Sequence, residues 1–422
     1  MKTIIFSVTK TIKFSVMKIL KCIVSLLLVL MLAGCNSKSG NSQDGATDET
    51  AKTVAIEFEV PDGIQESEQV IYFPFTTKEN GKTSIISVDG KILHADKFNG
   101  HVSATVNGYF WVNDNQKYQL YSSTAKPERI GGVYSEVTEF EDGRAIVRES
   151  GKPYTIIDGK ANIIKTLDKI DGKAPSYFEA FKSGYSIFDI PVNSEDLISL
   201  RGAIDRNGNC VIKAVYESLH YMGDNRFLAH DNDKWTIVEA GGRTIKTLPD
   251  GIEPLVGGIA FGTVPVEGES KSFHDSYGMI DTNGEFVIPM SEEIFLPEAI
   301  SPTAYIYKNQ HTDKWGIRDF NGNELVFPVY DDRSLMVEDI AERRIPDRVW
   351  AVYEDEQGTR TKELIDSQGN SISHRTFTFY GPGWRPFSNH EIVKIDNHEA
   401  IIDLITGEIV HEFADDEKVF GH

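Results

Sequence analysis

The sequence predicts an all-β fold of repeated β-hairpin and sheet units, propeller-like in architecture, with an open β-repeat array as the alternative. A hairpin pattern recurs along most of the 422 residues. From Val54 onward, apolar runs of four to seven residues alternate with turn signals, and we find no amphipathic helix pattern of useful length among them. Because an isolated hairpin is only marginally stable in water, neighbouring units must stack and bury a shared core.

The clearest copy of the hairpin pattern is Lys314–Asp332. Trp315 and Ile317 alternate with smaller or polar residues, as side chains do when they point to opposite faces of a strand. Asn321-Gly322 then supplies two residues that tolerate positive φ, which is a strong hairpin signal. A second β-prone run follows, and Pro328 interrupts its ladder because proline has no N–H to donate.

Related copies occur along the chain and predict about nine units in residues 54–422. The spacing of their turns is uneven, on the order of 34–49 residues, which is within the range of β-repeat proteins. Each unit is expected to contain an upstream strand, the hairpin and a short closing strand. The turns are expected near residues 90, 125, 159, 208, 242, 284, 322, 369 and 407.

The pattern resembles the WG-repeat family, whose unit runs roughly Lys-Trp-Gly-Tyr-Ile-Asp, a turn with Gly, then Val-Ile-Pro and Tyr-Asp. Lys314–Asp331 carries the resemblance most fully, followed by Tyr277–Pro289 and Arg201–Tyr216. Only one unit keeps Trp-Gly intact, since Trp235 is followed by Thr236. The resemblance covers most of residues 56–413. It implies a repeated β architecture and no shared catalytic residues.

The N-terminus has the features of a lipoprotein signal peptide, predicted to span residues 1–34. An apolar run, Ile23–Leu32, follows Lys18 and Lys21 and ends in Leu32-Ala33-Gly34-Cys35. That tetrad resembles a bacterial lipobox, which implies that Cys35 receives the acyl chains, palmitate among them. The alternative is a transmembrane helix, but the apolar run is shorter than the ~20 residues needed to span a bilayer. Met17 is an alternative start.

Residues 35–53 are rich in Ser, Gly, Asn, Asp and Thr and predict a flexible tether, which would hold the domain roughly 20–25 Å from the bilayer. The first 34 residues carry five lysines and no acidic residue, so the remaining chain has 38 basic and 64 acidic residues and a net charge of −26. This charge disfavours nucleic acid as a partner. We therefore expect a protein attached to a membrane of the bacterial cell envelope by its lipid, at the outer membrane in a Gram-negative cell.

Cysteine use permits no intrachain disulfide in the processed chain. Cys22 would be lost with the signal peptide and Cys35 would be lipidated, which leaves Cys210 alone. Cys210 begins a strand-like run, Cys210–Ile212, without a visible setting that would lower its pKa. We expect a buried and inert thiol.

No motif in the sequence predicts catalysis, a metal or a cofactor. Asp205–Asn209 and Asp319–Asn323 have oxygen ligands at alternate positions, but the glycine stands too early for a calcium loop and an Asx-turn explains the pattern. His411-Glu412 begins like a zinc-protease motif, yet Asp415 stands where the second histidine belongs. His390 and His398 lie on separate sides of a predicted strand and turn.

The most unusual stretch is Phe377–Phe387, which gathers five aromatic residues and one arginine around Gly-Pro-Gly. Tyr, Trp and Arg are the residue types enriched at binding hot spots. The alternative is that these aromatics fold back and seal the edge of unit eight. A weaker candidate, Tyr109–Trp111, is expected to be a core strand. The candidate binding residues of the loop are Tyr380, Trp384, Arg385 and Phe387.

These features predict a membrane-anchored cell-envelope lipoprotein whose β-repeat domain is a protein- or ligand-binding module without catalysis. Its expected partner is an envelope protein or a glycan. The alternative function is that of a propeller-type carbohydrate-active or carbohydrate-binding protein, with acids and aromatics lining a cleft. A structural spacer of the envelope is a third possibility. Aromatic residues at the unit ends, such as Trp315, Tyr330, Tyr216 and Trp235, are expected to pack between units.

Overall fold

The computed structural model describes residues 69–77, 82–88, 91–103, 105–192, 198–254, 259–263, 275–334, 347–378, 390–395, 398–414 and 417–419. Within these ranges every strand pairing is antiparallel and no helix of any kind is present. None of these described residues belongs to a helix capable of crossing a bilayer. The prediction of an all-β fold is confirmed.

The described residues form eight sheets, and the first four along the chain have four strands each. The first sheet contains β35 (Glu417–Val419), β1 (Tyr72–Thr77), β2 (Thr83–Ser87) and β3 (Ile92–Phe98). The second contains β4 (His101–Val102), β5 (Tyr109–Asp114), β6 (Lys117–Ser122) and β7 (Arg129–Tyr134). The third contains β8 (Glu136–Val137), β9 (Arg144–Arg148), β10 (Tyr154–Asp158) and β11 (Ile163–Leu167). The fourth contains β12 (Tyr177–Phe178), β13 (Tyr185–Pro191), β14 (Ser199–Asp205) and β15 (Cys210–Tyr216).

The next three sheets also have four strands, and the last has seven. The fifth contains β16 (Ser218–Gly223), β17 (Arg226–Asp231), β18 (Lys234–Glu239) and β19 (Thr244–Thr247). The sixth contains β20 (Ile252–Pro254), β21 (Ile259–Thr263), β22 (Asp275–Ile280) and β23 (Phe286–Ser291). The seventh contains β24 (Ile294–Ser301), β25 (Ala304–Asn309), β26 (Lys314–Asp319) and β27 (Glu324–Tyr330). The eighth contains β28 (Asp332–Ser334), β29 (Val349–Glu354), β30 (Arg360–Ile365), β31 (Phe377–Thr378), β32 (His390–Ile395), β33 (His398–Asp403) and β34 (Ile409–Glu412).

The seven-stranded sheet contains two repeat units that the short strand β31 joins. Phe377 pairs with Lys362 of β30, and Thr378 pairs with both Thr361 and Lys394 of β32. We number the repeat units 1 to 9 by their third strands, which are β2, β6, β10, β14, β18, β22, β26, β30 and β33. In each unit the turn expected from the sequence follows this third strand, and in units 4 and 7 the opening backbone N–H, that of Asp205 or Asp319, donates to a carbonyl four residues on.

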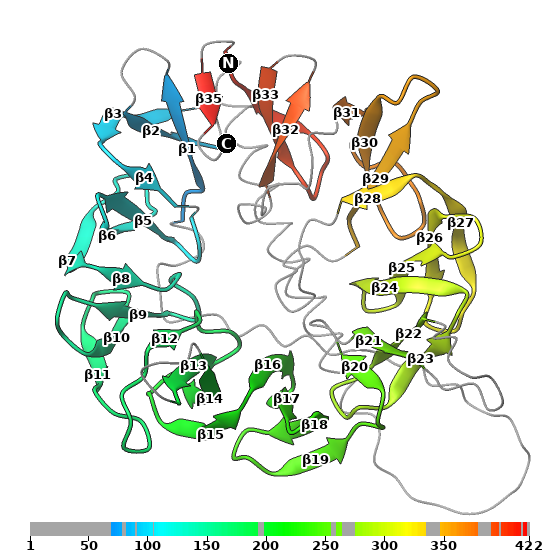
Figure 1. The fold of residues 1–422 in the computed structure, drawn as a ribbon. Helices are drawn as coiled ribbons and strands as arrows, with labels where there is room; N and C mark the ends of the chain where they lie inside the picture. The colour runs from blue at the N-terminus through cyan, green and yellow to red at the C-terminus, as the bar shows by residue number, and fades with distance from the viewer. Residues whose placement is uncertain are drawn as a thin grey trace, which may run out of the picture. The chain divides into compact units, whose positions relative to one another are not determined.

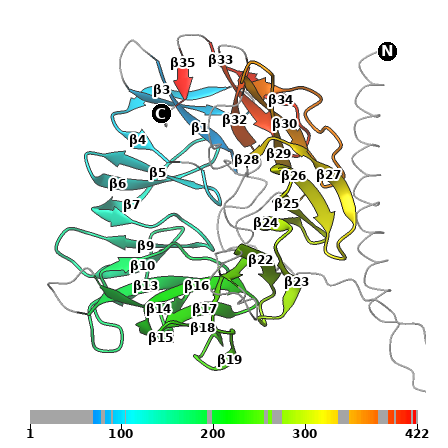
Figure 2. The same cartoon turned by 45° about the vertical axis from the view of Figure 1, so that its right-hand side comes forward.

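The units follow one another around a ring in chain order, so the architecture is a β-propeller (Figure 1). The turned view shows the same succession of sheets (Figure 2). The fourth strands β7, β11, β15, β19 and β27 lie on the outside of the ring. β35 pairs with β1, with Phe75 opposite Val419, and thereby joins the C-terminal strand to the first unit. The alternative of an open array is excluded by this closure.

The cores of the propeller lie between units. Among the described residues there are nine clusters of buried apolar side chains, and each contains residues of two neighbouring units. The cluster of units 7 and 8, for example, combines Trp315 and Tyr330 with Val349 and Ile365. Another cluster combines Ile86 of unit 1 with Ile401 of unit 9. Each unit therefore buries its faces against both neighbours, as the marginal stability of a lone hairpin requires.

The glycine of the repeat is required by a close approach of the fourth strand. A Cβ atom on Gly316 would lie 2.8 Å from the carbonyl oxygen of Val326. Gly202 and Gly278 stand at the same place in units 4 and 6, and a Cβ there would meet a fourth-strand carbonyl at 2.7 Å. The register between the third and fourth strands shifts at this point, so the fourth strand bulges toward the third. Glycine is the residue that leaves room for that approach.

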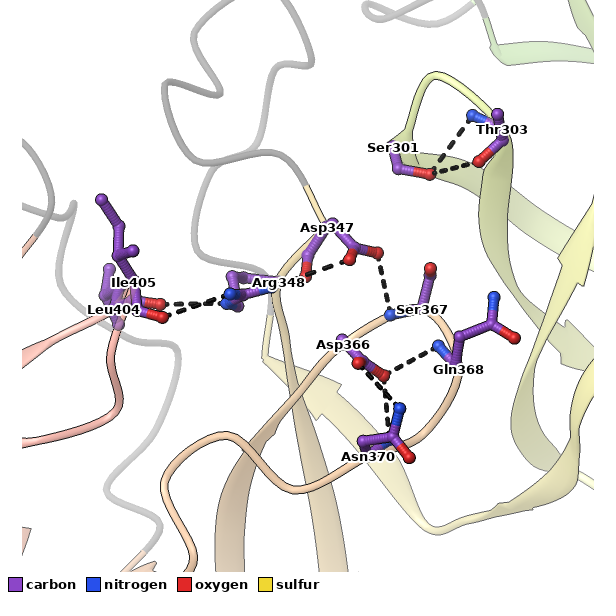
Figure 3. A network of polar contacts seen from close by, with 10 residues as sticks. All are labelled: Ser301, Thr303, Asp347, Arg348, Asp366, Ser367, Gln368, Asn370, Leu404 and Ile405. Carbon is purple, nitrogen blue, oxygen red and sulfur yellow. Dashed lines mark hydrogen bonds and ion pairs between the residues drawn. The ribbon is translucent and has the colours of Figure 1, made fainter. Parts of the chain in front are cut away.

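A polar network also links neighbouring units near Arg348 (Figure 3). The Arg348 guanidinium donates to the carbonyl oxygens of Leu404 and Ile405, both at 3.2 Å, which tie unit 8 to unit 9. The backbone N–H of Asp347 donates to the Ile300 carbonyl of unit 7 at 2.6 Å. This two-residue segment therefore contacts three successive units.

Candidate functional site

The aromatic loop is largely beyond what the structure describes. Its candidate binding residues all fall outside the described residues: Tyr380, Trp384, Arg385 and Phe387. The predicted lipidation site Cys35 falls outside them too. Phe377, which begins the loop, is described and is 1% exposed. Its ring packs edge-on against Trp350 with 5.6 Å between centroids, so this residue belongs to the core between units 8 and 9.

The two calcium-like loops are Asx-turns. The Asp205 carboxylate accepts hydrogen bonds from the backbone N–H groups of Asn207 and Asn209 at 2.9 and 2.8 Å. Asp319 accepts the equivalent bonds from Asn321 and Asn323 at the same distances. The oxygens that a cation would need are thus engaged by the turn itself, and the Asx-turn interpretation is confirmed. Among the residues that the structure describes, no three His, Cys, Asp or Glu side chains are grouped as metal ligands.

The prediction that Cys210 is buried is wrong. Cys210 is exposed, because it lies on β15, an outer strand of the ring, and the sequence run Cys-Val-Ile does not reveal that edge position. Desolvation and the neighbouring Asp171 carboxylate raise the pKa of its thiol to about 11. A thiol with that pKa is almost entirely protonated at neutral pH, so it is a poor nucleophile despite its exposure.

The weaker aromatic candidate, Tyr109–Trp111, is a core strand as predicted. These residues are 3%, 1% and 5% exposed and lie in the clusters on either side of unit 2. Trp315 and Tyr330 pack between units 7 and 8, also as predicted. Tyr216 and Trp235 are half-buried and pack against the clusters that join unit 5 to its two neighbours.

A cleft of about 410 Å³ lies where units 3, 4 and 5 meet. It is lined by first strands of these three units and by the connections that follow them in units 3 and 4. Unit 3 contributes Glu139 and Glu141, which follow β8. Unit 4 contributes residues from β12 through the start of β13, and unit 5 contributes the middle of β16. The polar and aromatic residues of these two units that line the cleft are Tyr177, Phe178, Glu179, Phe181, Lys182, Tyr185, His220 and Tyr221.

The connections are held in place from unit to unit. The backbone N–H of Gly184 in unit 4 donates to the Asp142 carboxylate of unit 3 at 2.7 Å. The Tyr185 hydroxyl donates to the side chain of Asn225 in unit 5 at 2.8 Å. The rings of Tyr185 and Tyr221 lie 5.6 Å apart across the same contact. The three connections therefore form one wall with a defined geometry.

An arginine beneath the cleft holds two carboxylates. Arg201 on β14 lies 3.1 Å from Glu179 through Nη1 and 3.3 Å from Asp189 through Nε. The same Nη1 also reaches the Leu219 carbonyl of unit 5 at 3.5 Å. Desolvation raises the pKa of Glu179 and of Asp189, and the positive charge of Arg201 offsets only part of that rise. The arginine thus fixes the position of two partly buried carboxylates, Glu179 in the cleft lining and Asp189 beside it.

The comparisons with known proteins agree with the repeat. A family model for the WG-containing repeat matches residues 129–152, 202–235 and 277–292. The chain therefore contains WG-type repeats in these three regions. The second match runs from the third strand of unit 4 into that of unit 5, and the third covers the third-strand hairpin of unit 6. No curated protein matches the sequence.

Solved structures of three proteins illustrate the similarity that this chain has to known folds. A eukaryotic initiation factor has 9% identity and a TM-score of 0.49, over 83% of this chain and 96% of that chain. The computationally designed Ika8 protein has 12% identity and a TM-score of 0.38, over 72% and 94%. AztD from Citrobacter koseri in its apo form has 12% identity and a TM-score of 0.36, over 83% and 95%. At these identities and TM-scores none of them bears on the function of this chain.

The position of the repeat's tryptophan holds a charged residue in three of the nine units, and Arg201 is one of them. The repeat's tryptophan stands four residues before the residue that opens the turn, as Trp315 stands before Asp319. It faces the next unit, where an apolar residue is expected. Arg201 occupies that position in unit 4 and is followed by the repeat's glycine, Gly202. Over the nine units, in order, the position holds Thr83, Tyr118, Tyr154, Arg201, Trp235, Tyr277, Trp315, Lys362 and Glu399.

Sequence reasoning missed the cleft because its residues are far apart in the chain. Glu139 and His220, which line the same cavity, are 81 residues apart in the numbering. One signal was available, since Arg201-Gly202 replaces Trp-Gly in an otherwise well-kept repeat. A charge at a position that should be apolar marks a departure from the packing rule, and such departures concentrate at functional sites.

Proposed function

We propose that this WG-repeat protein is a cell-envelope lipoprotein whose propeller is a binding module without catalysis. The observation that carries the binding role is the cleft between units 3, 4 and 5. It has a volume of about 410 Å³ and is lined by connecting loops on a rigid ring. Ligand sites commonly are concave, have volumes of a few hundred Å³ and are formed by loops that a scaffold positions.

The ionisable groups near the cleft support binding over covalent chemistry. Arg201 lies between Glu179 and Asp189 and contacts both, so each carboxylate has a cation close by. Cys210, the free thiol of the described residues, has its pKa raised to about 11. The thiol is protonated at neutral pH, and the carboxylates are held by an arginine. Such groups suit recognition by fixed polar groups.

The membrane attachment rests on the sequence. Leu32-Ala33-Gly34-Cys35 follows an apolar run and two lysines, and a polar stretch of residues 36–52 follows it. In this proposal Cys35 carries the lipid, and residues 35–53 form the tether to the propeller. The partner is an envelope protein or a glycan within reach of that tether, because the net charge of −26 disfavours polyanions such as nucleic acids.

The anchor can be tested by growing cells that make the full chain with an alkyne-tagged fatty acid. The wild-type chain is expected to take up the tag and to sediment with membranes. The Cys35→Ala variant is expected to lose the tag while its propeller stays folded. A Cys210→Ala variant serves as the matched control and should keep the tag. Equal labelling of wild type and Cys35→Ala would refute the lipidation.

The binding role can be tested by crosslinking cells that make the full chain and recovering it with its partners. Two variants are compared with wild type: Tyr177→Ala in the cleft and Trp384→Ala in the aromatic loop. A defined partner that is lost in Tyr177→Ala supports the cleft as the binding site. Loss in Trp384→Ala alone moves the site to the loop. Recovery of bulk envelope protein only, equal in all three, would overturn the proposal.

A further inference from the structure

We infer that the cleft of units 3, 4 and 5 binds a neutral sugar unit, at the end or within the chain of an envelope glycan. The inference rests on the proposed function, since it names the ligand class of the same cleft. It is carried by an exposed aromatic face beside a carboxylate that Arg201 holds in place, with further acceptors and a donor in the lining.

The cleft has room for a small sugar. Its volume of about 410 Å³ falls at the lower end of the range of small-molecule sites, roughly 300–1,000 Å³. It lies where the two-residue strands β8 and β12 and the connections after them meet β16. An extended glycan could enter from the solvent side and present one unit to the wall.

Tyr177 provides the aromatic face. It is 52% exposed, whereas the next residue, Phe178, is 3% exposed and belongs to the core of units 3 and 4. Most aromatic side chains of the described residues are buried in the nine inter-unit clusters, whereas Tyr177 is half-exposed beside a cavity. The electron-rich face of a tyrosine ring attracts the polarised C–H groups of a pyranose ring, which lie on one side of many sugars.

The polar groups suit a ligand that both donates and accepts hydrogen bonds. Glu179 lines the cleft and is held by Arg201 at 3.1 Å, so its carboxylate is oriented before any ligand arrives. Glu139 and Glu141 add acceptors from unit 3, while Lys182 adds a donor from unit 4. A sugar hydroxyl can donate to a carboxylate and accept from an ammonium. Preorganised groups lose less entropy on binding, which favours affinity.

The charge of the cleft selects against charged sugars and basic peptides. Three glutamates and one lysine line it, so a uronate or a phosphorylated sugar would be repelled. A basic peptide would have to compete with Arg201 for Glu179 and with the positive charge of Lys182. A neutral polyol can hydrogen-bond to these groups without displacing the arginine. The chemistry therefore favours a neutral sugar over either charged class.

The test is calorimetric titration of the full chain, purified in detergent, with short malto-, cello- and chito-oligosaccharides. An oligogalacturonate and an oligolysine peptide are titrated in parallel. We expect at least one neutral oligosaccharide to bind and both charged probes to fail. Tyr177→Ala should weaken binding by about tenfold or more, and Tyr177→Phe should preserve it. Glu179→Gln should weaken binding too, because an amide cannot replace both acceptor oxygens.

Phe327→Ala is the matched control, because Phe327 is 73% exposed on the outer strand β27, far from the cleft in sequence and in the ring. It should bind the sugar as wild type does. Thermal unfolding of each variant checks that the propeller is intact. Binding of the neutral sugar that Tyr177→Ala leaves unchanged would overturn the inference, as would binding of the oligolysine peptide alone.

The outcomes separate this inference from the proposed function. If crosslinking recovers a partner that is lost in Tyr177→Ala while no neutral sugar binds, the sugar inference fails and the binding module stands. If a sugar binds and is cleaved during the titration, the inference holds and the non-catalytic part of the proposed function fails. If no sugar binds and no partner is recovered, both fail.

Discussion

Units 7 and 4 use the same backbone position for opposite purposes. Trp315 in unit 7 is 6% exposed, pairs with Tyr330 in register and packs against apolar side chains of unit 8. Arg201 in unit 4 pairs with Tyr216 in the same register, yet its side chain joins two carboxylates beneath a cleft. The comparison teaches that this position can exchange an apolar contact with the next unit for ion pairs inside its own unit without a change in strand pairing.

The largest effect is expected where the contact is apolar. Trp315→Ala should lower the free energy of unfolding by about 3–5 kcal/mol, because it empties the core of units 7 and 8. Urea denaturation followed by circular dichroism measures the change. Phe327→Ala, on an exposed side chain of the same unit, should change it by less than about 0.5 kcal/mol. A Trp315→Ala variant as stable as wild type would show that inter-unit cores do not hold the ring together.

Lys362 stands at the same position in unit 8, and its side chain is buried. Its ammonium lies 2.8 Å from Glu391, whose other oxygen accepts a hydrogen bond from Trp350 Nε1 at 2.8 Å. The side chains of Lys362 and Glu391 are 6% and 0% exposed. Lys362→Met should therefore destabilise the protein by about 3 kcal/mol, since it leaves a buried carboxylate without its cation.

The control for Lys362→Met is the double variant Lys362→Met with Glu391→Gln, measured by the same denaturation. Removing both charges should restore most of the lost stability, because a buried pair replaced by uncharged residues is often near neutral. If the double variant is as unstable as the single one, packing around Trp350, and not the unpaired charge, determines the stability at this position.

The polar contact of unit 4 should be weaker and dependent on pH. Arg201→Ala is expected to lower the free energy of unfolding at pH 7 by about 1–2 kcal/mol, less than a buried pair because the groups are partly exposed. Burial already raises the pKa of Glu179 and Asp189, and loss of the arginine raises it further. A carboxyl whose pKa is raised in the folded state destabilises the protein progressively as pH rises from the ordinary carboxyl pKa to the raised one, and has no such effect at lower pH.

The difference between Arg201→Ala and wild type should therefore shrink as the pH is lowered toward the ordinary carboxyl range. Denaturation midpoints measured from pH 7 to pH 4 give this comparison. Glu179→Gln in the Arg201→Ala background should reduce the pH dependence. A difference that grows on acidification would contradict the assignment of the ion pair.

The smallest effect is expected at the turns, which both units share. Hydrogen bonds to the Asp319 carboxylate outweigh its desolvation and hold its pKa below the ordinary value. The stability from this group is present above that ordinary value and is lost as pH falls through the lowered one. Asp319→Ala should cost about 0.5–1 kcal/mol at neutral pH, since the turn is exposed. Asn321→Ala, which leaves the carboxylate in place, is the control in the same denaturation experiment.

The fold was predictable because its signals are local. Asn207-Gly208 and Asn321-Gly322 require a hairpin wherever they occur, and the runs on either side supply the strands. The Asx-turn at Asp319 follows from residues within four positions of one another. Closure of the ring was not predictable in this way, since β1 and β35 pair across almost the whole domain. The sequence therefore left the open array as an alternative.

The candidate site was predictable only in part, because it depends on which strands and loops meet. Cys210 looked like a buried residue, yet its strand β15 is the outer strand of its unit. Tyr177 has no local feature that marks its half-exposed ring. Arg201 could have been noticed in the sequence, as a charge in the place of the repeat's tryptophan. Its two carboxylate partners come from the strands that precede it, and their positions required the structure.

Closure of the ring by β35 has a consequence for how the protein is made. A ribosome synthesises β1 first and β35 last, so the first sheet lacks its inner strand until nearly the whole domain has been made. A chain that stopped before Glu417 would keep an unpaired edge on β1, open to pairing with other chains. The first sheet can therefore be completed only after β35 has been synthesised.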